Sequence, residues 1–336
     1  MPTLREVAAR AGVHVGTASR ALNEETRALV NDQTAQRVLL AAAELGYQPN
    51  PIARGLKTNR PMSIGVVIPD LTNPLFPPIV RGVEDALMAE GYTPLLVNTD
   101  NEVEREAVLV TALRHRQVDG LLFATARLHH PTITNLAADN VPLVLVNRRL
   151  DSAELPTVTS DDAAGVALAL DHLVELGHSR IAYIAGPQST STGTDRLAAF
   201  RAGMARHGLD SSAVVDTVRW SQPEGERAIA ELSAGHAGFT AVLAGNDLLA
   251  LGCYDYLARQ GLSCPADLSV IGFNDMQFMD KVHPGLTTVA LPQYDIGAMA
   301  ARLLLERIRQ PGTPPRRVVL PVSLTVRGST AAPRLS

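Results

Sequence analysis

The stretch SIGVVIP, residues 63–69, is a nearly unbroken apolar run, and runs of this kind decide the fold of the chain. Val, Ile and Leu runs that alternate with amphipathic segments are typical of parallel strands covered by helices on both faces. The pattern recurs at TPLLVN (93–98), DGLLFA (119–124), PLVLVN (142–147), RIAYIAG (180–186), AVVDTVRW (213–220), FTAVLAG (239–245) and LSVIGF (268–273). The sequence therefore predicts an α/β fold with doubly wound parallel sheets.

The length of this region predicts two lobes. Single hydrophobic cores stop growing near about 250 to 300 residues, and the whole chain has 336. Two further apolar runs, TTVALP (287–292) and RRVVLPVSLTV (316–326), flank one more helical segment. We therefore expect residues 62–330 to form two α/β lobes, with the chain crossing between them more than once.

The first 47 residues are helical in pattern and predict a separate small domain. Thr3 and Glu6 have the spacing of a capping box, and Gly12 is placed to end the helix that follows. A second helix is predicted over 15–22, and a third follows Asn31. Two short helices joined by a tight turn, with a third helix behind them, form a helix-turn-helix arrangement.

The second of these helices has an outer face that suits DNA. In this motif its N-terminal end enters the major groove. Arg20 has the geometry to bond guanine, and Val15 to contact a thymine methyl group. The residues left on the outer face are Val15, Gly16, Ser19 and Arg20, and Thr17 and Asn23 are placed to contact phosphates. From spacing alone, a surface helical bundle without a DNA role stays open.

The charge distribution separates the head from the rest. Residues 1–60 hold eight Lys and Arg against five Asp and Glu, while the whole chain has a net charge of -4. A basic head on an acidic body suggests that the head alone meets a polyanion.

The sequence lacks the signals that are typical of several classes of protein. The N-terminus, MPTLREVAARAG, has no charged segment followed by an apolar one, so we expect no secretory signal and a cytoplasmic protein. No apolar run is long enough to cross a membrane. Cys253 and Cys264 are too isolated for a disulfide framework. Phosphate-binding and hydrolase motifs are missing, so we expect no catalytic residues, cofactor or metal.

Two polar pairs could be taken for functional groups. His129 and His130 have no other metal ligand near them in sequence, so we expect a solvated loop. Asp161 and Asp162 resemble a catalytic pair, but adjacent residues of an extended chain point to opposite faces. Helix capping is the preferred interpretation for this pair.

Two segments of the head and hinge have a recognisable joint pattern, TLREVAARAGVHVGTASRALN (3–23) and LGYQPNPIARGLKTNR (45–60). Further segments follow in the body: IGVVIPDLTNPLF (64–76), HLVELGHSRIAYIAGP (172–187), DRLAAF (195–200), AVLAGNDLLALG (241–252) and LSVIGFND (268–275). Together these segments resemble the LacI/GalR family of bacterial transcription regulators. The resemblance covers nearly the whole chain. It implies a homodimer that binds a palindromic operator, with a body of periplasmic-binding-protein type I that also carries dimerisation.

The resemblance also assigns a role to the hinge, residues 48–61. A helix this short is unstable alone, and Gly55 costs it roughly 1 kcal/mol relative to Ala. On DNA the resemblance places Leu56 as an apolar wedge in the minor groove. Arg54 and Lys57 would then contact phosphates or the floor of the groove. Thr3 is also predicted to contact DNA. The sequence departs from the family at His14, where Ser is usual, and at Gly16, which has no side chain to read a base.

Ligands of open parallel sheets bind beyond the carboxyl ends of the strands. The predicted effector-binding residues at these ends are Phe76, Asn147, Arg196, Trp220, Asn246 and Asn274. Polar hydrogen-bonding groups with one or two aromatic rings suit a sugar, sugar phosphate or nucleoside. The resemblance places Arg196, Asn246 and Asn274 on effector positions. Asn147 and Asn274 stand where many members carry Asp, and Arg148 and Arg196 belong to the same set of loops, so an anionic effector is a hypothesis.

Each of these assignments has an alternative. Phe76 could only close a loop, Trp220 could be a core residue, and Arg196 could be a surface partner of Asp195. For the whole protein, the alternatives are a sugar-binding transport receptor, which requires export, and a nucleotide-using α/β enzyme, which requires phosphate loops. The leading interpretation is an effector-controlled repressor.

Overall fold

The computed structural model describes residues 2–23, 26–47, 61–151, 154–236 and 238–334. The chain divides into two compact units, Met1–Met62 and Ser63–Ser336, which we call the head and the body. The hinge residues Arg54, Leu56 and Lys57 lie outside the described residues.

The head is a bundle of short helices whose ends are set by local capping. It contains α1 (Leu4–Ala11), α2 (Val15–Ala21), the 3-10 turn η1 (Arg27–Leu29) and α3 (Asp32–Leu45). The predicted capping box is present, with the Thr3 hydroxyl accepting from the Glu6 amide and the Glu6 carboxylate accepting from the Thr3 amide. Gly12 and Gly46 close α1 and α3 in the left-handed conformation. Val7 and Val38 are fully buried at the centre of the bundle.

The first lobe of the body is built on a six-stranded sheet in the order β11-β5-β4-β3-β1-β2. Its strands are β1 (Ser63–Ile68), β2 (Thr93–Asn98), β3 (Gly120–Phe123), β4 (Leu143–Val146), β5 (Thr157–Ser160) and β11 (Arg317–Leu320). Its helices are α5 (Phe76–Met88), α6 (Val103–His115), α7 (Pro131–Ala138) and α12 (Gln293–Arg309). The paired strands are parallel, and Ile64 of β1 lies opposite Pro94 of β2 and Gly120 of β3.

The second lobe repeats this plan with the strand order β12-β10-β9-β8-β6-β7. Its strands are β6 (Ile181–Ala185), β7 (Val214–Asp216), β8 (Ala241–Ala244), β9 (Ser269–Asn274), β10 (Thr287–Ala290) and β12 (Ser323–Thr325). Its helices are α8 (Asp162–Glu175), α9 (Ser191–Arg206), α10 (Gln222–Gly235) and α11 (Asp247–Gln260). Only β12 runs antiparallel to its neighbour among the described pairs. The Tyr183 and Phe200 rings stack in its core, with centroids 4.6 Å apart.

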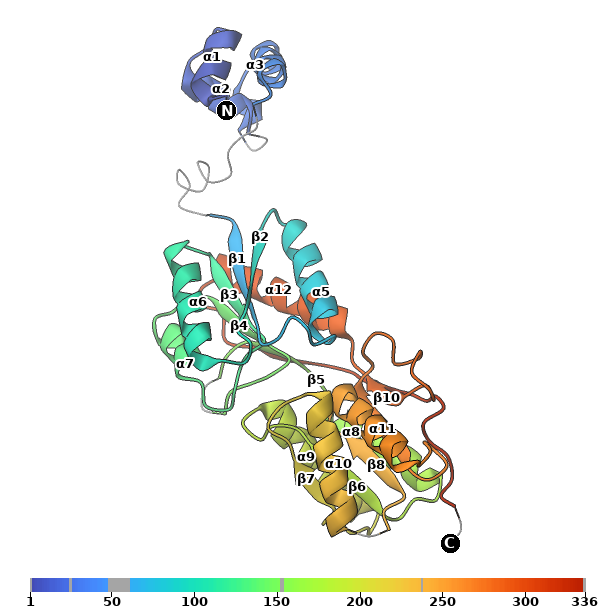
Figure 1. Cartoon of the computed structure of the whole chain (residues 1–336). Coiled ribbons are helices and arrows are strands. Elements are labelled where there is room, and N and C mark those ends of the chain that lie inside the picture. The colour runs from blue at the N-terminus through green and yellow to red at the C-terminus, as the bar shows by residue number, and fades with distance from the viewer. Residues whose placement is uncertain (1, 24–25, 48–60, 152–153, 237, 335–336) are drawn as a thin grey trace. The chain divides into compact units, whose positions relative to one another are not determined.

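The predicted two-lobed α/β fold is confirmed, and so are the repeated crossings. The chain passes between the sheets after β5, after β10 and after β11. As a result α12, from late in the chain, lies beside α5 of the first lobe (Figure 1). One strand was missed by the sequence prediction. Strand β5, with the sequence TVTS, is buried at every position, but its hydroxyl side chains hide it from an apolar pattern.

Close packing of α5 and α12 depends on two glycines. A Cβ at Gly82 would lie 2.0 Å from the Tyr294 carbonyl oxygen, and a Cβ at Gly297 would lie 1.9 Å from that of Ile79. The two helices therefore touch backbone to backbone at both positions, which no larger residue permits. This contact holds α12 over the sheet of the first lobe.

Candidate effector cleft and DNA-binding surface

The carboxyl ends of the strands face each other across a cleft between the two lobes. The cavity in this cleft encloses about 270 Å³ of space between atoms, open solvent included. It is lined by Asn73, Leu75, Phe76, Asn147, Arg148, Thr192, Arg196, Trp220, Asn246 and Asn274. The structure thus brings together all six residues that the sequence predicted for the effector site. Asn73, Leu75, Arg148 and Thr192 were not among the predicted effector-binding residues, although Arg148 was part of the reason for expecting an anionic effector.

Arg196 lies at the centre of the cleft and is 2% exposed. Its Nε and Nη2 both donate to Asp162 Oδ1 at 2.9 Å, and its Nη1 donates to the Gly245 carbonyl at 2.7 Å. Its guanidinium also lies 3.7 Å from the centre of the Phe273 ring. The alternative in which Arg196 is a surface partner of Asp195 is wrong, because Asp195 bonds Arg149 instead.

Asp162 takes a different role from its neighbour Asp161. Asp161 caps α8, its Oδ1 accepting from the Ala164 amide, as expected. Asp162 points inward to Arg196. Burial raises the pKa of Asp162, while Arg196 and the Ser160 hydroxyl oppose this by stabilising the carboxylate. The capping interpretation is therefore right for one residue of the pair only, because the first turn of a helix points successive side chains in different directions.

Trp220 closes one wall of the cleft, and its ring packs directly on the backbone of two glycines, Gly186 and Gly245. A Cβ at Gly186 would be 1.8 Å from its Cη2 atom, and a Cβ at Gly245 would be 3.1 Å from the ring. The two glycines follow β6 and β8, so the ring covers the ends of these strands. Trp220 is partly exposed and lies 5.8 Å from the Arg196 guanidinium. It is thus not a plain core residue, whereas Phe76, 1% exposed, both begins α5 and lines the cavity.

Gly186→Ala should displace the Trp220 ring from the cleft. Because the added Cβ overlaps the indole, the ring must move toward solvent, and its fluorescence emission should shift to longer wavelength. The chain has one tryptophan, so this signal reports the cleft alone. The matched control is Gly312→Ala, since a Cβ at Gly312 meets no atom within 4 Å. An unchanged emission maximum in Gly186→Ala would contradict the close packing of the ring.

The two asparagines Asn147 and Asn274 are held in uncommon backbone conformations. Their φ angles are 64° and 120°, in the region that disfavours side chains. Strain of this kind gathers at functional sites. Both side-chain Oδ1 atoms are buried without a hydrogen-bond partner. Buried polar groups are normally satisfied, so these two acceptors indicate a polar ligand. Asn246 differs, since its Oδ1 accepts from the Leu249 amide and caps α11.

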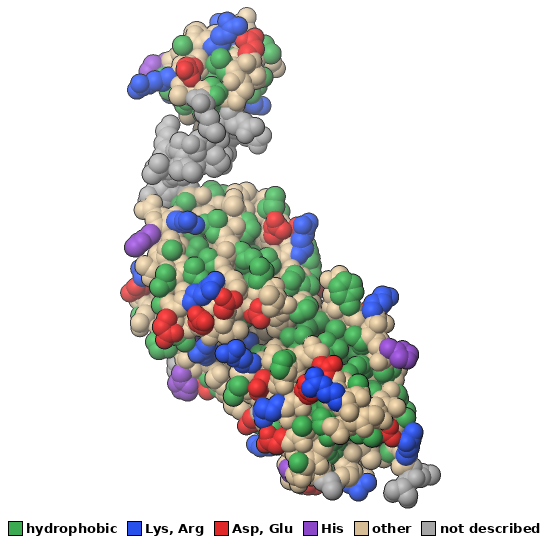
Figure 2. Space-filling model, viewed as in Figure 1, with side chains coloured by type: hydrophobic (Ala, Val, Ile, Leu, Met, Phe, Trp, Pro, Cys, Tyr) green, Lys and Arg blue, Asp and Glu red, His purple; other side chains and the backbone are tan. Residues whose placement is uncertain are grey.

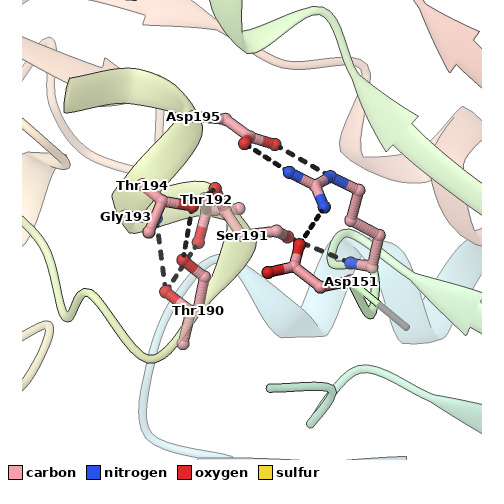
Figure 3. Close-up of polar contacts among 8 residues, drawn as sticks. Asp151, Thr190, Ser191, Thr192, Gly193, Thr194 and Asp195 are labelled. Atoms are coloured by element: carbon pink, nitrogen blue, oxygen red, sulfur yellow. Dashed lines mark hydrogen bonds and ion pairs between the residues drawn. The ribbon is translucent and has the colours of Figure 1, made fainter. Parts of the chain in front are cut away.

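The loops beside the cleft join the two lobes directly. Arg149, which follows β4, donates to both carboxylate oxygens of Asp195 in α9 and to Asp151. The Arg149 amide donates to the Ser191 hydroxyl at 3.0 Å, and Figure 3 shows Ser191, Asp195 and Asp151 drawn together around these contacts. We call these contacts the interlobe bridge. The interlobe bridge connects the first lobe to the second and stabilises one arrangement of the two lobes.

A larger hollow lies on the first lobe between α5 and α12. It encloses about 600 Å³ of space between atoms, open solvent again included. Its polar side chains bond one another, Tyr294 to Asp85 and Arg309 to Glu90. The cleft is the better candidate site because it holds buried polar atoms without partners, at Asn147, Arg148 and Asn274. On the face in Figure 2, acidic, basic and apolar side chains are mixed over the body.

The histidine pair also differs from expectation. His129 is exposed, but His130 is 5% exposed, and its Nε2 lies 2.6 Å from Glu106 Oε1. The solvated-loop interpretation is therefore wrong for His130, because α6 carries Glu106 into the same buried region. In the part of the chain that the structure describes, no cluster of His, Cys, Asp and Glu could hold a metal. Cys253 and Cys264 are both free thiols.

Most of the residues predicted to contact DNA lie on α2 or next to it in the head. His14 caps α2 in place of the usual Ser, its Nδ1 accepting from the Gly16 amide at 3.1 Å. Arg20 is exposed. Val15 is half-buried and packs against the head core. Gly16, Thr17, Ser19 and Asn23 are also half-buried, and Thr3 is exposed. Among the described residues no helix is long and apolar enough to span a membrane.

These features define the class of protein: a helix-turn-helix head on a two-lobed binding body. Comparison with known families gives the same result. Residues 3–50 match the bacterial regulatory proteins of the lacI family, and residues 170–330 match the periplasmic binding protein-like domain. The chain belongs to the LacI family. It is a DNA-binding transcription regulator and not an enzyme, since its relatives are repressors.

The similarity extends over nearly the whole chain. The ribose operon repressor of Halalkalibacterium halodurans is 34% identical over 98% of this chain and 97% of its own. The lac repressor dimer bound to operator and the anti-inducer ONPF is 28% identical, with a TM-score of 0.88, over 98% of this chain and 99% of its own. A LacI family regulator of Enterococcus faecium with bound ribose is 33% identical, with a TM-score of 0.71, over 80% of this chain and 99% of its own.

Proposed function

We propose that the protein is a cytoplasmic repressor that binds a palindromic operator as a dimer and is controlled by a small polyhydroxylated effector in the cleft. The observation that carries the proposal is the pair of buried, unpartnered amide oxygens of Asn147 and Asn274 beside Arg196. Hydroxyl groups of a sugar donate well to such acceptors. The ribose bound by a relative of 33% identity supports a sugar-sized ligand.

Control would act through the angle between the lobes. Residues of both lobes line the cavity. Arg149 of the interlobe bridge directly follows Arg148, which is one of these lining residues. A ligand that bonds both walls stabilises the closed arrangement relative to an open one, and only such a difference in affinity shifts the equilibrium. In this proposal residues 48–61 are the hinge that carries the change to DNA, with Leu56 entering the minor groove and Arg54 and Lys57 on its backbone.

A gel shift tests this function directly. The probe is the promoter beside the protein's own gene, with and without a panel of sugars, sugar phosphates and nucleosides. The proposal expects a specific complex whose affinity one class of ligand changes, and the direction shows whether the ligand induces or co-represses. A full-length chain that binds no operator, or binds it identically with every ligand, would remove the proposal.

Arg20→Ala should weaken operator binding about 5- to 150-fold, since a paired bond to guanine contributes about 1–3 kcal/mol of discrimination. The loss should be specific for the operator and small on random DNA. Arg37→Ala is the matched control, because Arg37 is exposed on α3 and forms no bond with a described residue. Equal losses in the two variants would show that charge, and not base contact, explains the effect.

A further inference from the structure

The cleft contains a buried cation without a partner. Arg148 is 6% exposed and makes no hydrogen bond or ion pair with any described residue. Its Nε is fully buried and unsatisfied. It follows Asn147 at the end of β4, so its side chain lines the same cavity. A buried charge without a partner is costly to a fold, and this one therefore points to something that the protein binds.

The charged groups around Arg148 do not neutralise it. Asp162 is bonded to Arg196, while Asp151 and Asp195 are bonded to Arg149. Burial, and then repulsion from Arg127 and Arg196, lowers the pKa of Arg148 to about 10. The guanidinium still stays protonated near neutral pH. The cavity wall thus carries two cations, Arg148 and Arg196. The carboxylate of Asp162 forms an ion pair with Arg196 and so compensates only one of the two charges.

The rest of the polar wall is uncharged. Asn147 and Asn274 supply free Oδ1 acceptors. The Oδ1 atoms of Asn73 and Asn246 accept from backbone amides of Leu75 and Leu249, which leaves their NH₂ groups as donors. These groups suit hydroxyls but add no negative charge. A neutral sugar would satisfy the amides and leave the excess positive charge of the cleft in place.

We propose, on the basis of the proposed function, that the effector is a polyhydroxylated anion and that Arg148 binds its charged group, a phosphate or a carboxylate on a sugar-sized scaffold. Arg148 then forms charge-assisted bonds that are shorter and stronger than bonds to neutral oxygens. A planar guanidinium also matches both groups in a two-bond geometry.

The test compares matched ligands on the full-length protein. Ribose, ribose 5-phosphate and ribonate are titrated by calorimetry and by Trp220 fluorescence into wild type, Arg148→Gln and Arg148→Lys. In wild type one of the two anions should bind about 10- to 100-fold more tightly than ribose, as expected for bonds to a charged group. The phosphate and carboxylate arms identify which anion. The preference should fall below about threefold in Arg148→Gln and be partly kept in Arg148→Lys.

A second measurement is independent of the sugar scaffold. Inorganic phosphate is compared with chloride at equal ionic strength on the full-length protein. It should raise the Tm of wild type and of Arg148→Lys more than the Tm of Arg148→Gln. Without added anion, Arg148→Gln should be at least as stable as wild type, because an uncompensated buried charge is removed. Equal phosphate shifts in wild type and Arg148→Gln overturn the inference, and so does ribose binding as tightly as both anions.

The two proposals fail in different ways. A protein that binds its operator and responds to ribose alone keeps the proposed function and refutes the anionic effector. A protein that binds phosphate through Arg148 but no operator refutes the function and keeps the anion site.

Discussion

Asp162→Ala should lower the free energy of unfolding of the body by about 3–5 kcal/mol, the cost of leaving one partner of a buried ion pair alone. Arg196 would lose its carboxylate while staying 2% exposed and stacked on Phe273. The cleft would then hold two uncompensated cations, Arg148 and Arg196. The loss should appear as a lower midpoint in urea, with an unchanged slope if the native and denatured states keep their compactness.

The adjacent residue provides the control. Asp161→Ala removes only the cap of α8, which contributes about 1 kcal/mol. A double variant, Asp162→Leu with Arg196→Met, removes both charges and should recover much of the stability while losing effector binding. If Asp162→Ala costs no more than Asp161→Ala, the buried pair does not hold the cleft together.

Gly297→Leu should destabilise the first lobe by at least about 3 kcal/mol, the upper end for overpacking a core. The reason is backbone contact, since the first added carbon would lie 1.9 Å from the Ile79 carbonyl oxygen and 3.0 Å from the Val83 amide. A flexible side chain could move aside, but two helix backbones can only separate. Because α12 also packs on β3, β4 and β5, its separation from α5 should open the lobe. Hydrogen exchange of α12 and α5 measures this opening.

The control for this variant is Gly235→Ala at the end of α10. A Cβ at Gly235 meets no atom within 4 Å. The substitution should be neutral or stabilise by up to about 1 kcal/mol through helix propensity. Similar exchange in Gly297→Leu and wild type would mean that the helices tolerate a wider spacing.

Local signals accounted for most of the fold. The caps at Thr3, Asn31 and Gly46 are set by hydrogen bonds within a single turn, so sequence spacing locates them. The strands appeared as apolar runs because both faces of each sheet are buried. Strand β5 could not be found in this way, since Thr and Ser satisfy buried positions only through neighbours that are distant in sequence. Trp220 was included in a predicted strand that ends at Asp216.

The sequence by itself determined the class of fold and the set of loops that reach the cleft. Parallel strands bring their carboxyl ends to one edge, so the sequence could nominate six residues that the structure places around one cavity. Only the tertiary structure decided how the charges pair. Arg148, Arg149 and Arg196 compete for Asp151, Asp162 and Asp195, and the outcome depends on which side chains two lobes bring within about 3 Å. From sequence, a pairing of Asp195 with its neighbour Arg196 stayed open as an alternative. In the structure Asp195 pairs with Arg149 across the cleft, and Arg148 has no partner among the described residues.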